Sequence, residues 1–150
     1  MRIRRGPAAA LVGVVLLLAA ATIIAGCISD ETGRVVIIPQ NECWSPVMSS
    51  AVGIGLSAEY SESGDVIYEW SADYGGFVLW TPEIIPCDPP CTTSETVWWT
   101  YMQEGSPMPA DLPEEVRVNV KAKEAHSGKT LAETAIVLVK NDDGTYCTAE

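Results

Sequence analysis

Few residues of this chain are of the types that carry out catalysis. His126 is the only histidine, and it falls in a predicted turn. No serine has a base placed beside it by a motif, and the chain lacks a glycine-rich phosphate loop and a cofactor fingerprint. We therefore predict no catalytic residue and no cofactor, and we expect the protein not to be an enzyme. A pocket that joined carboxylates to His126 would reopen that alternative.

One run of side chains has oxygen atoms of the kind that calcium prefers. Asn141-Asp142-Asp143-Gly144 offers three such side chains before a glycine. The run lacks the spacing of a calcium loop, and Asp-Gly is common in turns. We therefore predict a turn here, with a metal site as the alternative that the residue types leave open.

The first 26 residues have the pattern of an export signal. Arg2, Arg4 and Arg5 precede a run from Gly6 to Gly26 that holds no charged residue. A positive start, an apolar stretch and small residues before a polar chain are typical of such signals.

The end of that stretch, Ile24-Ala25-Gly26-Cys27, resembles the prokaryotic lipobox. The resemblance implies a signal peptide over residues 1–26, cleavage before Cys27 and lipidation of the Cys27 thiol with diacylglycerol. An uncleaved transmembrane helix is the alternative, because about 20 apolar residues span a bilayer. Both interpretations place the remaining chain outside the cytoplasm, and the first predicts a lipid-anchored protein on the extracytoplasmic face of the cell membrane.

The charge of the remaining chain excludes one class of partner. All 20 acidic residues follow Cys27, whereas three of the nine basic residues lie in the signal, which leaves a formal charge of −14. Such a charge repels nucleic acid and anionic lipid headgroups. We therefore expect no nucleic-acid partner, and we expect contact with the membrane to be made through the lipid anchor.

Four cysteines remain once Cys27 is assigned to the lipid. In an exported domain an even number of cysteines indicates disulfides. Three pairings are open, and we predict Cys43–Cys147, which joins the two ends of the domain, and Cys87–Cys91, which braces a short turn. A four-cysteine zinc site is a weak alternative, because neither a C-x-x-C spacing nor a histidine supports it.

The chain after Cys27 shows the two-residue period of β-strands. Residues 27–42 are predicted to form a tether that contains a short edge strand at 35–38, and residues 43–150 the folded domain. Two segments, 81–94 and 103–113, are predicted as loops. Polar and apolar side chains alternate, or β-forming residues gather, in the segments predicted as strands: 52–58, 66–72, 77–80, 96–102, 116–122 and 134–139.

Several of these segments are similar to Ig-like and PKD-like domains of prokaryotic surface proteins. The similarity covers about residues 47–140 and rests on four runs: Tyr68-Glu69-Trp70-Ser71-Ala72, Gly75-Gly76-Phe77, Val97-Trp98-Trp99-Thr100 and Val116-Arg117-Val118-Asn119-Val120. It implies an immunoglobulin-like β-sandwich with Trp70 in its core. Strand number and turn spacing favour the same all-β fold, with about seven strands after an N-terminal signal or transmembrane helix.

Two tryptophans are candidate binding residues. Adjacent strand residues point to opposite faces, so an inward Trp99 places Trp98 outward, near Trp80. An outward tryptophan stacks on a sugar ring or on a side chain of a partner. The alternative is that the loop 81–94 covers it.

These features together predict a cell-surface lipoprotein whose Ig-like domain is a non-catalytic binding or structural module of the envelope. Its expected partner is another envelope protein or a glycan. One alternative is an inhibitor that inserts the loop 81–94, braced by Cys87–Cys91 and its prolines, into a foreign enzyme. A glycan-binding module is the other alternative.

Overall fold

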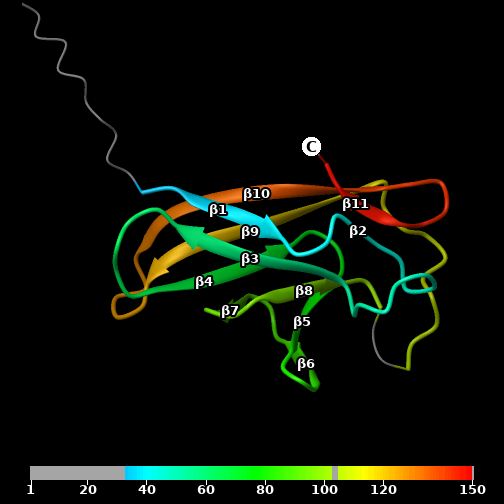
Figure 1. The fold of residues 1–150 in the computed structure, drawn as a ribbon, viewed down its shortest axis with the longest axis horizontal. Coiled ribbons are helices and arrows are strands. Elements are labelled where there is room, and N and C mark those ends of the chain that lie inside the picture. The colour runs from blue at the N-terminus through cyan, green and yellow to red at the C-terminus, as the bar shows by residue number, and fades with distance from the viewer. Residues whose placement is uncertain (1–32, 103–104, 150) are drawn as a thin grey trace, which may run out of the picture. The chain divides into compact units, whose positions relative to one another are not determined.

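The computed structural model describes residues 33–102 and 105–149 (Figure 1). The predicted signal peptide 1–26 and the lipidation site Cys27 lie outside the described residues. All regular secondary structure in the described part of the chain is β, which confirms the predicted fold class at that level. None of the residues described forms a helix that is long and apolar enough to cross a membrane.

The strands form two antiparallel sheets, labelled sheet A and sheet B here. Sheet A has the order β1 (Val35–Pro39), β3 (Ile54–Tyr60), β8 (Val97–Thr100), β5 (Gly76–Trp80) and β6 (Ile84–Cys87). Sheet B has the order β2 (Cys43–Trp44), β11 (Tyr146–Thr148), β10 (Thr130–Lys140), β9 (Glu115–Glu124), β4 (Val66–Ala72) and β7 (Cys91–Thr93).

Side-chain alternation explains why these segments pair as they do. In β9 the alternate residues Val116, Val118, Val120 and Ala122 are fully buried, and the residues between them are polar. In sheet A, Ile54 and Leu56 of β3 and Val97 and Trp99 of β8 are also fully buried. Each sheet thus contributes one apolar face to a single core cluster, and burying each such aliphatic side chain contributes roughly 1.5–3 kcal/mol.

Aromatic rings join the two sheets at one end of this core. The Trp99 ring of β8 lies 5.1 Å from the Tyr146 ring of β11 and 6.4 Å from the Trp44 ring of β2, centroid to centroid. Their polar atoms are bonded as well, because Trp99 Nε1 donates to the Tyr74 carbonyl (2.9 Å) and Tyr146 Oη to the Pro113 carbonyl (2.5 Å). Trp70, the predicted core tryptophan, is fully buried against Phe77.

The four cysteines pair as predicted. Cys43 and Cys147 are opposite each other on β2 and β11, with S–S at 2.05 Å and Cα atoms 4.0 Å apart. Cys87 at the end of β6 bonds Cys91 at the start of β7, with S–S at 2.10 Å. The first disulfide ties the chain ends of the domain within sheet B, and the second ties the edge of sheet A to the edge of sheet B.

The structure differs from the prediction in the number and placement of short strands. Residues 33–149, apart from 103–104, contain eleven strands rather than about seven. The segment 81–94, predicted as an irregular loop, contains β6 and β7. Its prolines do not prevent this, since proline is tolerated in edge strands such as β6. Strand β1 corresponds to the edge strand predicted at 35–38, and because it pairs with β3, the folded part of the chain begins within the segment predicted as a tether.

The two disulfides should differ in their contribution to stability. They close chain segments with sequence separations of 104 and 4 residues. In the chain-entropy model, replacing Cys43 and Cys147 by serine lowers the free energy of unfolding by about 4–5 kcal/mol, whereas replacing Cys87 and Cys91 lowers it by about 2 kcal/mol. Urea unfolding of the full chain in detergent, against the unsubstituted protein, measures both losses. Equal losses from the two double variants would contradict this expectation.

Candidate binding face

The tryptophan pair of β8 occupies both faces of sheet A. Val97 and Trp99 are fully buried, and Trp98 between them is half-buried on the outward face. The Trp98 ring lies 5.0 Å from the Trp80 ring of β5 in an edge-to-face arrangement with an interplanar angle of 78°. Trp80 keeps 39% of its surface exposed. The structure therefore brings together the two tryptophans that were predicted as binding residues.

Their neighbours on the outward face are apolar. The pairing of strands places Trp98 opposite Val78, Val78 opposite Pro86, and Trp80 opposite Ile84. Directly opposed residues of an antiparallel pair share a face of the sheet. The surface formed by Val78, Trp80, Ile84, Pro86 and Trp98 is called the Trp80–Trp98 face below, and Ile84 is 52% exposed on it.

Gly55 makes room for the Trp98 ring. It lies opposite Trp98 on β3, and a Cβ atom built on it would stand 2.9 Å from Trp98 Cζ3 and 2.9 Å from Gln40 Cβ. Those distances are shorter than real contacts of Cβ atoms. A glycine at this position therefore lets the indole lie against the backbone of the neighbouring strand.

The polar groups beside this face are already hydrogen-bonded. Gln40 Nε2 donates to Ser57 Oγ at 3.0 Å and to the Ile38 carbonyl at 3.4 Å. Ser57 Oγ also donates to the Ile38 carbonyl, at 3.3 Å. These bonds leave few side-chain donors for a polar ligand.

Sheet A is also almost free of charge. Among the residues of its five strands only Glu59 is charged. The strands of sheet B carry Glu69, Arg117, Lys121, Lys123 and further charged residues. An outward face with two tryptophans and a single charged strand residue, Glu59, has the composition found at the centre of protein interfaces.

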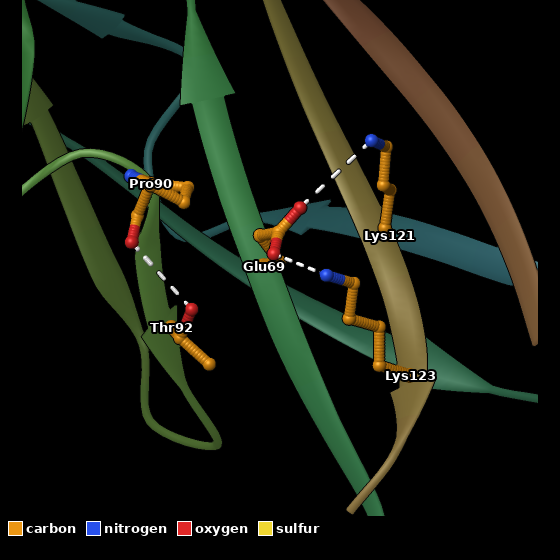
Figure 2. A network of polar contacts seen from close by, with 5 residues as sticks. All are labelled: Glu69, Pro90, Thr92, Lys121 and Lys123. Atoms are coloured by element: carbon orange, nitrogen blue, oxygen red, sulfur yellow. Dashed lines mark hydrogen bonds and ion pairs between the residues drawn. The ribbon is translucent and has the colours of Figure 1, made fainter. Parts of the chain in front are cut away.

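The outward face of sheet B is organised differently, as Figure 2 shows. Glu69 of β4 lies between two lysines of β9, with its carboxylate 3.8 Å from Lys121 Nζ and hydrogen-bonded to Lys123 Nζ. Beside them Thr92 Oγ1 donates to the Pro90 carbonyl at 3.5 Å. The acidic and basic groups here satisfy one another, as expected of a solvated sheet face.

The other residues considered in the sequence occupy turns. His126 lies in the turn between β9 and β10 with its side chain 84% exposed, and its Nδ1 is 3.7 Å from an Asp65 carboxylate oxygen. Residues 141–144 form the turn between β10 and β11, in which Gly144 N donates to the Asn141 carbonyl at 3.0 Å. In residues 33–102 and 105–149 no three histidine, cysteine or acidic side chains converge around a point where a metal would bind.

A hollow that the sequence does not predict lies at the loop end of the domain. Its volume is about 220 Å³, and side chains from three separate loops line it: Val47, Met48, Tyr101, Met108, Leu112 and Asp143. Burial and Tyr74 raise the pKa of Tyr101, and the backbone N–H of Thr145 lowers the pKa of Asp143. Within each loop these apolar residues are not regularly spaced, so no local sequence pattern predicts the hollow.

Comparisons with protein-family models, with curated proteins and with solved structures found no match to this chain. The candidate binding face therefore rests on its own geometry.

Gly55→Ala should disturb the Trp80–Trp98 face and lower stability. The new methyl group needs the space of the Trp98 ring and the Gln40 side chain, and overpacking of this kind typically costs about 1–3 kcal/mol. Gly76→Ala is the matched control, because Gly76 is also in sheet A and a Cβ there meets nothing within 4 Å. Urea unfolding, together with tryptophan fluorescence, measures both effects. Equal stability of the two variants would contradict the packing described for Gly55.

Proposed function

We propose that this chain is a lipid-anchored, extracytoplasmic binding module that uses the Trp80–Trp98 face to hold a protein of the cell envelope. The observation that carries the proposal is the outward-facing pair of half-buried Trp98 and exposed Trp80 on a sheet whose strands contain one charged residue. Contiguous exposed apolar surface of this kind marks interaction sites.

The proposed domain type is an immunoglobulin-like sandwich. Support comes from the strand order, because β1-β3-β8-β5 on one sheet and β10-β9-β4 on the other follow the arrangement ABED and GFC of constant-type domains. In that correspondence β2, β6, β7 and β11 are short additions at the sheet edges. Folds of this type host many functions, so the fold alone does not name the partner.

A protein fits the face better than a glycan. A sugar presents many hydroxyl groups, and a site for it must supply hydrogen-bond partners. Here Gln40 and Ser57 are bonded to each other and to the backbone, and Val78, Ile84 and Pro86 offer none, so the side-chain donors of the face are the indole N–H groups of Trp80 and Trp98. Tryptophans surrounded by aliphatic side chains are instead the usual composition of an energetic centre in protein interfaces.

A non-catalytic role agrees with the placement of the titratable groups. His126 is exposed in a turn, and its side chain is near one carboxylate, that of Asp65. The four cysteines of the domain are consumed in disulfides. The inhibitor alternative has less support, because β6 and β7 fix much of the segment 81–94 to the sheet edges.

Site-specific photo-cross-linking tests the binding face. A benzophenone amino acid at position 84 should give a protein adduct of one defined mass in intact cells, whereas the same group at position 133, on β10 of sheet B, should give none. Trp80→Ser should lower the yield about tenfold, as expected for the loss of an interface hot spot. Ile67→Ser, an apolar-to-polar change on sheet B, should leave it unchanged.

A glycan or lipid adduct at position 84 would contradict the proposed class of partner. The absence of any adduct at that position would contradict binding by this face. Neither outcome depends on the identity of the partner, because the mass of the adduct itself distinguishes protein, glycan and lipid.

The anchor is tested separately. Mass spectrometry of the protein extracted from membranes should show a mature chain that begins at Cys27 and carries acyl groups. Cys27→Ser removes the thiol that would accept the lipid, so this variant should carry no acyl groups and should keep residues 1–26. A wild-type protein that begins at Met1 without acyl groups would contradict the lipid anchor and favour the transmembrane alternative.

A further inference from the structure

The loop-end hollow has features that the proposed function does not use. Its lining residues belong to three connections: the one between β2 and β3, the one between β8 and β9, and the one between β10 and β11. It shares no residue with the Trp80–Trp98 face. Its role can therefore be tested independently of the binding face.

An ordered turn presents two apolar side chains at its rim. Ser49 N and Met48 N both donate to the Ser45 carbonyl, at 3.0 and 3.3 Å, and Ser45 N donates to Ser49 Oγ at 3.2 Å. In spite of this order Val47 is 79% and Met48 80% exposed. Large apolar side chains that an ordered turn presents to solvent beside an apolar hollow indicate a surface that another molecule covers.

The floor of the hollow is aromatic and its edge is acidic. Tyr101 is buried there, and its ring centroid lies 5.2 Å from that of Trp44. Asp143 lines the same hollow from the β10–β11 turn, where its Oδ1 accepts the Thr145 N–H at 2.9 Å. That hydrogen bond lowers the pKa of Asp143, which keeps the carboxylate ionised.

A carboxylate beside an aromatic ring and two methionines selects a cation with an apolar body. Asp143 is exposed to solvent, and its negative charge repels an anion and attracts a cation at the edge of the hollow. Methionine side chains adapt to alkyl chains of varied shape, and aromatic rings attract ammonium groups.

Among the natural cationic side chains, lysine fits this hollow better than arginine. Arginine gains most from two parallel bonds to a carboxylate, and Oδ1 of Asp143 is already bonded to the backbone. Lysine brings a single ammonium group on an alkyl stem and needs one acceptor. A free amine of similar size would leave Val47 and Met48 uncovered, so a polypeptide with apolar residues beside the lysine is the better occupant.

We propose that the loop-end hollow binds a lysine side chain of a partner polypeptide, flanked there by apolar residues. Asp143 receives the ammonium group, Tyr101 and Met108 contact the alkyl stem, and Val47 and Met48 contact the flanking apolar residues.

Methyl NMR of the full chain in detergent micelles tests this proposal. With [¹³C-methyl]methionine, the signals of Met48 and Met108 report on the hollow, and that of Met102, which does not line it, is the internal reference. The probe is the peptide acetyl-Leu-Lys-Leu-amide, compared with peptides that hold norleucine or glutamate in place of lysine. We expect the lysine peptide to shift Met48 and Met108 and to bind about tenfold more tightly than the norleucine peptide, as expected for one charge-assisted hydrogen bond.

Two variants and a free amine complete the test. Asp143→Asn keeps an acceptor for Thr145 and should reduce the affinity for the lysine peptide to that for the norleucine peptide, whereas Asp142→Asn should leave it unchanged. Equal binding of the lysine and norleucine peptides, or the absence of shifts at Met48 and Met108, would overturn the proposal. Binding of n-butylamine as tight as that of the lysine peptide would overturn the assignment to a polypeptide.

Discussion

The pleat of a β-strand forces Trp98 and Trp99 onto opposite faces of sheet A, and both the core and the binding face follow from this constraint. Trp99 is fully buried and meets rings from β2 and β11 of sheet B, so it holds the two sheets together. Trp98 must then point outward, where it meets Trp80. A shift of β8 by one residue would bring Trp98 inward and turn Val97 and Trp99 outward, which would replace the ring contacts described here.

The Cys43–Cys147 disulfide acts on the same end of the structure. Strands β2 and β11 have only two and three residues, which is too short to be stable by pairing alone. The bond between their opposed cysteines fixes Trp44 and Tyr146, which are neighbours of the cysteines in the chain and pack against Trp99. The turns that follow β2 and precede β11 are thereby held in place, and these turns supply Val47, Met48 and Asp143 to the hollow.

Sequence patterns predicted what depends on local alternation and failed where distant segments meet. The strand 116–122 was predicted because its apolar residues alternate with polar ones, and it corresponds to β9. Cysteine pairing was predicted from position in the chain. Strands β6 and β7 were not predicted, because Pro86 and the cysteines interrupt any alternation of polar and apolar residues. Their pairing depends on the neighbouring strands of the two sheets, which are distant in the sequence. The hollow could not be predicted, because its residues become neighbours only after three loops converge.

The distribution of charge is compatible with the proposed binding of a protein by an acidic chain through an apolar surface. Few acidic groups belong to the strands around the Trp80–Trp98 face, since the strands of sheet A contain one charged residue, Glu59, and the lysines of β9 pair with Glu69 on sheet B. Strand β1, which continues from the proposed tether, forms one edge of sheet A, and β6 forms the other. Neighbouring strands lie about 4.8 Å apart, so four spacings separate β1 from β6 by roughly 19 Å. A partner that binds over β5 and β6, as proposed, would therefore contact the domain at the edge of sheet A farthest from β1, the strand that follows the proposed tether.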